Sequence, residues 1–307
     1  MNRLTFAPDL VEEAVLLAEH ALMRREDVQV FRRERDRIYL LLDDREREEA
    51  FRSLHLRYFS GLGLGAVVAD VLGGRSELTS HVNACRVVRA LDAREESADL
   101  VDALIAGRSH GVPTLFIRLR PATLVGPQDR LKAFLHHELT HVADMLNPTF
   151  GYERELPPSD EGPSADNILR DRYRVVWDTT IDGRLVRAGR VPASAGEAQW
   201  RDFAATFSML NGECRTAFER WFNEENATHE GIVAFAVSPA GASTPSNRCP
   251  LCRFPVAVLD PRVDTMADVV VRIIQSEQPK WNRDQGICSQ CLDLYEARHE
   301  ERHTVER

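Results

Sequence analysis

The sequence predicts an α+β fold, mostly helical with a small sheet, followed by a small cysteine-containing module. Apolar residues recur at helical spacing along most of the 307 residues. Two short segments, 36–43 and 114–120, instead have the apolar and β-branched content of strands. Four cysteines gather after a segment rich in Pro, Gly and Ser, residues 238–247. Together these observations indicate one large domain and one small module.

The N-terminal third alternates predicted helices with one strand. Residues 8–25 have Pro8 near a first turn and an apolar stripe at helical spacing. The segment 36–43 predicts a short buried strand, and helical patterns follow at 44–58 and about 64–72. Residues 95–107 also look helical.

The middle of the chain predicts a strand followed by a long helix. The alternating segment 114–120 ends at Pro121. A helix then runs from about Gln128 to Met145 and stops before Asn147 and Pro148. Residues 149–166 have loop composition.

The rest of the chain predicts further helices, at about 167–188, 197–210 and 212–225. The composition of 238–247 is that of a linker. We therefore expect a domain at 1–237, a linker at 238–247 and a module at 248–307.

Composition and charge exclude several classes of protein. No run of 18 apolar residues occurs and the N-terminus lacks signal-peptide order, so we expect a soluble, cytoplasmic protein with no membrane partner. The net charge of −9 argues against nucleic acid as a partner. Cys85 and Cys214 stand alone, and we expect both to be buried and inert.

The helix predicted at 128–145 carries a motif with metal-ligand spacing. His137 and His141 are four residues apart, so both imidazoles lie on one face and can bind the same Zn²⁺. Glu138 lies next to the first histidine and can reach a metal-bound water without binding the metal. The metal lowers the pKa of that water towards about 7, and Glu138 takes its proton. A catalytic-type zinc site is the prediction.

The motif His137-Glu138-Leu139-Thr140-His141 resembles the zincin metallopeptidases. The resemblance implies a zinc-dependent enzyme that hydrolyses peptide bonds of a peptide or protein substrate. It also implies that a strand over the cleft binds an extended substrate, a role for which residues 114–120 are placed.

A catalytic zinc needs a third protein ligand. The metzincin extension fails, because Asp144 and Asn147 stand where its glycine and third ligand should be. Downstream, Asp178 and Asp182 are four apart on one predicted helix. Asp178 as ligand with Asp182 hydrogen-bonding a zinc-bound histidine resembles the gluzincin pattern, with Asp replacing Glu. In an aspzincin-like arrangement Asp182 is itself the ligand.

Alternatives to the third ligand remain open. The two aspartates could simply form salt bridges with neighbouring arginines, and the loop acids Glu153 and Glu155 are weaker ligand candidates. An oxyanion-stabilising side chain is also expected. The sequence offers four candidates for it, and His229 could also approach the cleft from the later helices; the four are Tyr152, Tyr173, His136 and Arg184.

The C-terminal cysteines predict a second, structural zinc site. They form two Cys-x-x-Cys pairs, Cys249 with Cys252 and Cys288 with Cys291. Four thiolates make a closed tetrahedral site that stabilises a small module. A helix is expected at about 264–277 between the pairs. The arrangement is zinc-ribbon-like, and such a module could also recruit a protein partner.

Two alternatives to this assignment remain, one without catalysis and one with a different class of substrate. In the first, both metals brace a non-catalytic zinc-binding protein-interaction scaffold. The second follows from a resemblance to SprT-like proteases, which act on proteins attached to DNA and share the order of motif and zinc module. Their third ligand is a histidine, which this sequence does not supply.

Overall fold

The computed structural model describes residues 3–101, 104–105, 108–109, 112–158, 162–239, 247–256 and 258–305. Its fold is α+β and mostly helical, as predicted. The chain divides into two compact units, residues 1–147 and 148–307. Most of the predicted linker, residues 240–246, lies outside the described residues. The predicted domain boundary at residue 237 therefore stays a prediction.

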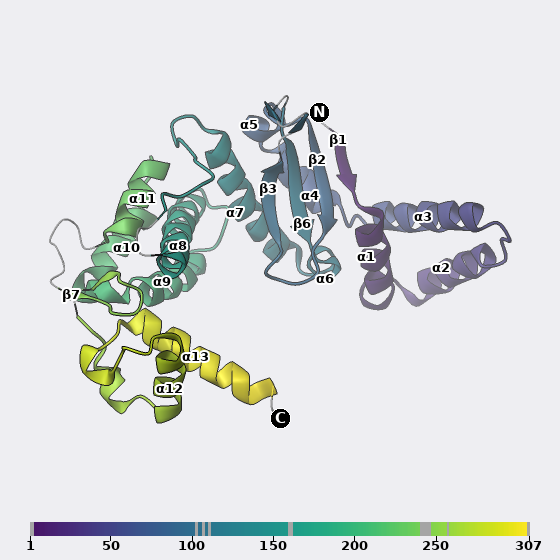
Figure 1. Ribbon diagram of the computed structural model, residues 1–307. Helices are drawn as coiled ribbons and strands as arrows, with labels where there is room; N and C mark the ends of the chain where they lie inside the picture. The colour runs from purple at the N-terminus through teal and green to yellow at the C-terminus, as the bar shows by residue number, and fades with distance from the viewer. Residues whose placement is uncertain are drawn as a thin grey trace. The chain divides into compact units, whose positions relative to one another are not determined.

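The first unit contains a four-stranded sheet (Figure 1). Its strand order is β1-β2-β6-β3. β1, β2 and β6 run parallel to one another, and β3 runs antiparallel to β6. Their bounds are Arg3–Phe6 for β1, Ala84–Arg89 for β2, Thr114–Leu119 for β6 and Ser97–Val101 for β3. A two-stranded pair, β4 (Leu104–Ile105) and β5 (Arg108–Ser109), follows β3 in the chain.

Alternation along β6 explains how the sheet joins the core. Leu115, Ile117 and Leu119 have no exposed surface, and they belong to the same buried cluster as Leu135 and Leu139 of helix α7. Successive side chains of a strand point to opposite faces, so these three side chains share one face. Through this shared core, α7, the helix that carries His137 and His141, packs against the sheet.

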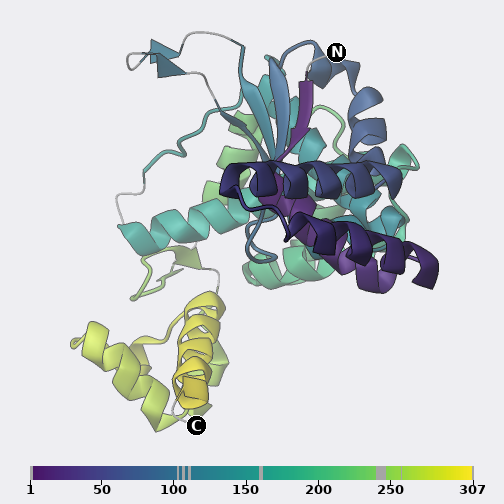
Figure 2. The same cartoon turned by 90° about the vertical axis from the view of Figure 1, so that its right-hand side faces the viewer.

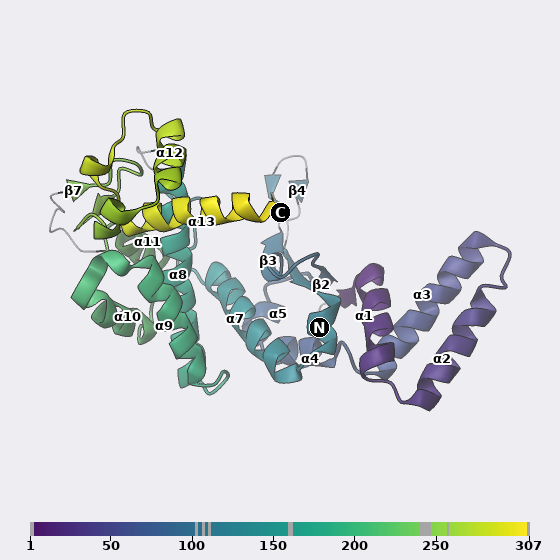
Figure 3. The ribbon, with the colours of Figure 1, turned by 90° about the horizontal axis from the view of Figure 1, so that it is seen from below.

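Among the helices of the first unit, α1 contacts β2, α7 contacts β3, and α2 contacts α3. Figures 1 and 3 show α2 and α3 as an antiparallel hairpin. Among the described residues no single helix is long and apolar enough to cross a membrane, although α3 and α4, bent by 63°, pass that test as a pair. The helices are α1 (Pro8–Ala21), α2 (Arg25–Ile38), α3 (Asp44–Gly61), α4 (Ala66–Gly73), α5 (Ser76–Thr79), α6 (Pro121–Val125) and α7 (Gln128–Leu146).

Two secondary-structure predictions in this unit are wrong. The predicted strand 36–43 is the end of α2 and a turn, and Leu42 is 97% exposed, so this apolar run is not buried. The predicted helix 95–107 contains β3 and β4 instead. Pairing of β3 with β6 supplies backbone hydrogen bonds that override the local helical pattern.

The role predicted for residues 114–120 is also wrong. These residues form β6, whose two edges are both paired, one with β2 and one with β3. A strand in that position cannot accept a substrate peptide at its edge. Among the described strands of this sheet, β3 takes the edge position on the side of β6.

In the second unit, the long helix α8 contacts three other helices. A methyl group on Gly183 of α8 would lie 1.7 Å from the carbonyl oxygen of Phe222, so α8 and α10 approach closely where no side chain intervenes. The elements are α8 (Pro163–Arg187), α9 (Ser194–Thr206), the 3₁₀ helix η1 (Ser208–Glu213), α10 (Cys214–Phe222) and α11 (His229–Val237).

The C-terminal module of this unit is a short hairpin followed by helices. Figure 2 shows its two α-helices, α12 and α13, side by side. The helix predicted at 264–277 is α12, and it begins at Asp268. The elements are β7 (Asn247–Arg248), β8 (Pro255–Val256), η2 (Pro261–Thr265), α12 (Asp268–Glu277), η3 (Arg283–Gln285) and α13 (Ser289–Val305).

Candidate metal sites

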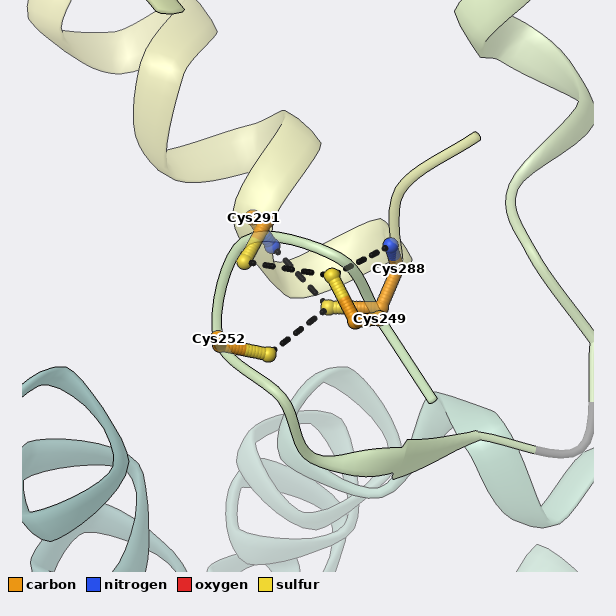
Figure 4. A group of neighbouring side chains, drawn as sticks. All are labelled: Cys249, Cys252, Cys288 and Cys291. Carbon is orange, nitrogen blue, oxygen red and sulfur yellow. Dashed lines mark hydrogen bonds between the residues drawn. The ribbon is translucent and has the colours of Figure 1, made fainter. Parts of the chain in front are cut away.

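The four C-terminal cysteines converge in a buried cluster (Figure 4). The Sγ atoms of Cys249 and Cys291 are 3.9 Å apart, and those of Cys252 and Cys288 are 3.8 Å apart. In a tetrahedral site with Zn–S bonds of about 2.3 Å, neighbouring sulfur atoms are about 3.8 Å apart. The spacing therefore fits a tetrahedral metal ion bound by all four thiolates.

A backbone turn next to each pair of cysteines directs their side chains into the cluster. The first pair lies in the turn between β7 and β8, where Arg253 N–H donates to Cys249 O at 2.8 Å and Arg253 has a φ of 61°. The second pair lies at the start of α13, just after Gly286. The φ of Gly286 is 63°, and a Cβ there would lie 2.7 Å from Leu259. Because this second pair begins a helix and not a second hairpin, a zinc ribbon is not confirmed.

Backbone N–H groups donate to two of the four sulfur atoms, and such bonds favour the thiolate, the form of cysteine that binds metal. The backbone N–H of Cys288 donates to Cys249 Sγ and that of Cys291 to Cys288 Sγ, each at 3.4 Å. Hydrogen bonds among the four thiols lower the pKa values of Cys249 and Cys288 and raise those of Cys252 and Cys291. The pattern is that of a preformed metal site, as the sequence predicted.

The predicted histidine pair lies on α7. The ring centroids of His137 and His141 are 5.0 Å apart, and both side chains are half-buried. Leu135, Leu139 and Val142 of the same helix have no exposed surface. The buried stripe anchors α7 in the core, so the two imidazoles are held on one partly covered face.

The carboxylate of Glu138 is bound to the edge of the sheet. Its Oε2 accepts a hydrogen bond of 3.0 Å from the backbone N–H of Ala98 in β3. This bond fixes the side chain that the motif assigns as general base, and it places that side chain beside the edge strand. Sequence alone gave no signal for the contact, since the two residues are 40 positions apart.

Like the contact between Ala98 and Glu138, the role of Arg75 was not predicted from the sequence. It is 8% exposed, and its Nη2 donates to the carbonyl oxygen of His136 at 3.0 Å and to Thr140 Oγ1 at 2.7 Å. Thr140 Oγ1 in turn donates to His136 O at 2.7 Å. Arg75 therefore binds α7 at the turn that carries His137 and Glu138.

The two candidate third ligands lie on α8, in the second unit. Both side chains are half-buried, and Asp178 accepts a hydrogen bond of 3.2 Å from Arg174. The Asp178 side chain is 14% exposed, whereas that of Arg174 is 63% exposed. The structure thus contains one of the salt bridges that the sequence left open. An exposed i,i+4 pair contributes only about 0.3–0.5 kcal/mol, so it is compatible with a second role for Asp178.

Two oxyanion candidates, Tyr152 and Tyr173, lie in an aromatic cluster with His229. Tyr173 Oη and His229 Nδ1 form a buried hydrogen bond of 2.7 Å, and Tyr152 and Trp177 pack against these rings. Burial lowers the pKa of His229, although Glu153 opposes the shift. A neutral His229 is therefore favoured at neutral pH.

The remaining candidates have ordinary surroundings. Arg184 Nε donates to Thr180 O at 3.3 Å on the same helix, and Glu153 and Glu155 are exposed. Cys85 and Cys214 are buried, as predicted. Burial raises the pKa of Cys85 to about 12 and also raises that of Cys214, so both thiols stay protonated.

Comparisons of the chain with protein-family models, with curated proteins and with solved structures found no match.

Proposed function

We propose that the chain is a zinc-dependent metallopeptidase, in which His137 and His141 bind the metal and Glu138 is the general base. The observation that carries the proposal is the hydrogen bond from Ala98 N–H to Glu138. It puts a carboxylate, between two potential ligands, at the edge of a sheet.

Asp178 is the third ligand in this proposal, and Asp182 is the alternative. Two histidines and a carboxylate are ligands of the kinds and number that hold a catalytic zinc ion. Three nitrogen and oxygen ligands with one open position are typical of catalytic zinc, whereas closed sites use four protein ligands. The aspartate that does not bind the metal would orient a ligand histidine.

Residues of this chain would supply the proton transfer and the substrate binding. Bound zinc supplies a Lewis acid that polarises the substrate carbonyl and acidifies the attacking water. Glu138 accepts the proton of that water and can deliver it to the leaving amine. β3 replaces the strand first expected to bind substrate, because it is the strand that contacts Glu138.

The test is the Glu138→Gln variant of the full chain, with Asp129→Asn as the control. Asp129 is an exposed acid in the first turn of the same helix. Removal of a general base lowers turnover by about 10²- to 10⁴-fold. We expect Glu138→Gln to retain its zinc and to lose hydrolysis of a fluorogenic peptide library by that factor, while Asp129→Asn cleaves like wild type. Equal cleavage by wild type and Glu138→Gln would contradict the assignment.

A specific observation also favours a second candidate, the zinc-binding scaffold. The hydrogen bond from Ala98 gives Glu138 a structural partner, so its presence does not by itself require catalysis. If the chain is a scaffold, we expect Glu138→Gln to lower the melting temperature, because it disturbs this hydrogen bond. We then also expect no peptide cleavage by the zinc-loaded wild type. The same two variants therefore separate the candidates.

A further inference from the structure

A buried arginine lies where the four-cysteine module meets the helices of its own unit. Arg172 is on α8 and is 2% exposed. Burial lowers the pKa of its guanidinium to about 10. A buried cation costs free energy unless an opposite charge compensates it, so the surroundings of Arg172 must supply one.

The neighbours of the guanidinium are almost all uncharged. It lies 4.5 Å from the centre of the Phe254 ring, and its Nη2 is 4.0 Å from Met209 Sδ. Its Nε is buried and has no hydrogen-bond partner. Arg172 and Asp260 line the same pocket of about 230 Å³, but Asp260 is held by Arg262 at 2.7 Å. Among the described residues, Arg172 has no carboxylate partner.

The cysteine cluster can supply the missing charge. Cys288 lines the same pocket as Arg172, and negative charge on Cys252 and Cys288 stabilises the charged guanidinium. Four protonated thiols carry no charge, whereas four thiolates around one Zn²⁺ carry a net charge of −2. Metal loading therefore creates the compensating charge beside Arg172.

The segment between the second pair of cysteines also forms direct contacts with the neighbouring helices. Ser289 and Gln290 lie between Cys288 and Cys291. Ser289 Oγ is 3.1 Å from Ser208 Oγ, and Gln290 Nε2 donates to the carbonyl oxygen of Thr206 at 2.8 Å. A metal that fixes the two cysteines also fixes the two residues between them.

We propose that Arg172 is the counter-charge of the metal-loaded four-cysteine site, and that metal loading holds the C-terminal module against α8 and η1. The proposal rests on metal binding by the cysteines and is independent of peptidase activity. In this proposal Arg172 is a positioning residue. It links metal binding by the four cysteines to the packing of the C-terminal module against α8 and η1.

Cobalt substitution tests the proposal in the full chain. Co²⁺ bound by thiolates absorbs through sulfur-to-metal charge transfer, which a histidine–carboxylate site lacks. Titration with Co²⁺ and displacement by Zn²⁺ then give the affinity of this site alone. The variants are Arg172→Met, Arg172→Lys and the control Arg201→Met, which removes an exposed charge from α9.

Loss of an outer-shell partner lowers metal affinity by roughly 10- to 100-fold, and we expect this factor for Arg172→Met. Arg172→Lys should keep most of the affinity, and Arg201→Met should bind like wild type. Equal affinities for Arg172→Met and Arg201→Met would overturn the proposal. Absence of the charge-transfer band from wild type would instead refute metal binding by the cysteines.

Hydrogen exchange in the wild type tests the packing without a substitution, in case Arg172→Met does not fold. Removal of the metal with a chelator should speed exchange in residues 165–176 of α8 and 206–211. Unchanged exchange in both segments would overturn the link between metal loading and packing.

Discussion

Gly183 is a residue whose size decides how two helices pack. A Cβ at this position would lie 1.7 Å from the carbonyl oxygen of Phe222 and 2.7 Å from its carbon, and both are backbone atoms that cannot rotate away. Arg187 Nη1 also donates to this carbonyl oxygen. The helix therefore accepts glycine here despite its low helix propensity.

We predict that Gly183→Ala destabilises the chain by about 1–3 kcal/mol, because α8 and α10 must separate to admit the methyl group. The control is Gly73→Ala, at the end of α4, where a Cβ would meet nothing within 4 Å. Urea unfolding of both variants measures the difference. A loss for Gly183→Ala no larger than that for Gly73→Ala would contradict the close approach of the helices.

Individual residues differ in how far the sequence predicted them. The four cysteines and the pair His137 and His141 were found from spacing alone, since a turn or a helix fixes the distance between near neighbours. Arg75 and Arg172 were not found. Their partners lie far away in the sequence, and an arginine in a chain rich in arginine carries no signal of its burial.

At the level of elements, a few hydrogen bonds add to the buried stripe that anchors α7 in the core. Arg75 donates hydrogen bonds to His136 O and Thr140 Oγ1, and Ala98 N–H donates to Glu138. These contacts bind one turn of α7 to the residue that precedes α5 and to β3. The turn in question carries His137 and Glu138.

We predict that Arg75→Met loosens this turn, because it removes two hydrogen bonds to α7 and leaves the buried Thr140 Oγ1 without the donor that Arg75 supplies. Leaving a buried group unsatisfied costs about 1–3 kcal/mol, and stability should fall by that amount. Zinc affinity at the His137 site should fall as well. The control is Arg130→Met, which removes an exposed arginine from the same helix. Equal unfolding midpoints and equal zinc affinities for the two variants would contradict this role of Arg75.

Long periodic elements were predicted well, whereas among the short ones β6 was predicted correctly and β3 was not. The helices α1, α7, α8 and α12 were expected close to their observed bounds, because an amphipathic stripe over several turns is a strong signal. β3 was mistaken for part of a helix. A five-residue strand depends on its partner, β6, and no local pattern contains that partner.

On the scale of the whole molecule, two metal sites of different character are proposed within one chain. The four-cysteine cluster is closed and buried, and its chemistry suits a structural metal. The histidine pair on α7 is half-buried and has a hydrogen-bonded acid beside it, which suits a metal with an open position. The proposed peptidase needs both: one to hold the C-terminal module and one to act on substrate.

The number of zinc ions per chain, measured by native mass spectrometry of wild type, His137→Ala and Cys249→Ser, decides whether α7 carries a metal site. We predict two zinc ions in the wild type and one in each variant, because each substitution removes a ligand from a different site. One zinc ion in both wild type and His137→Ala would contradict the central claim that α7 carries a metal site.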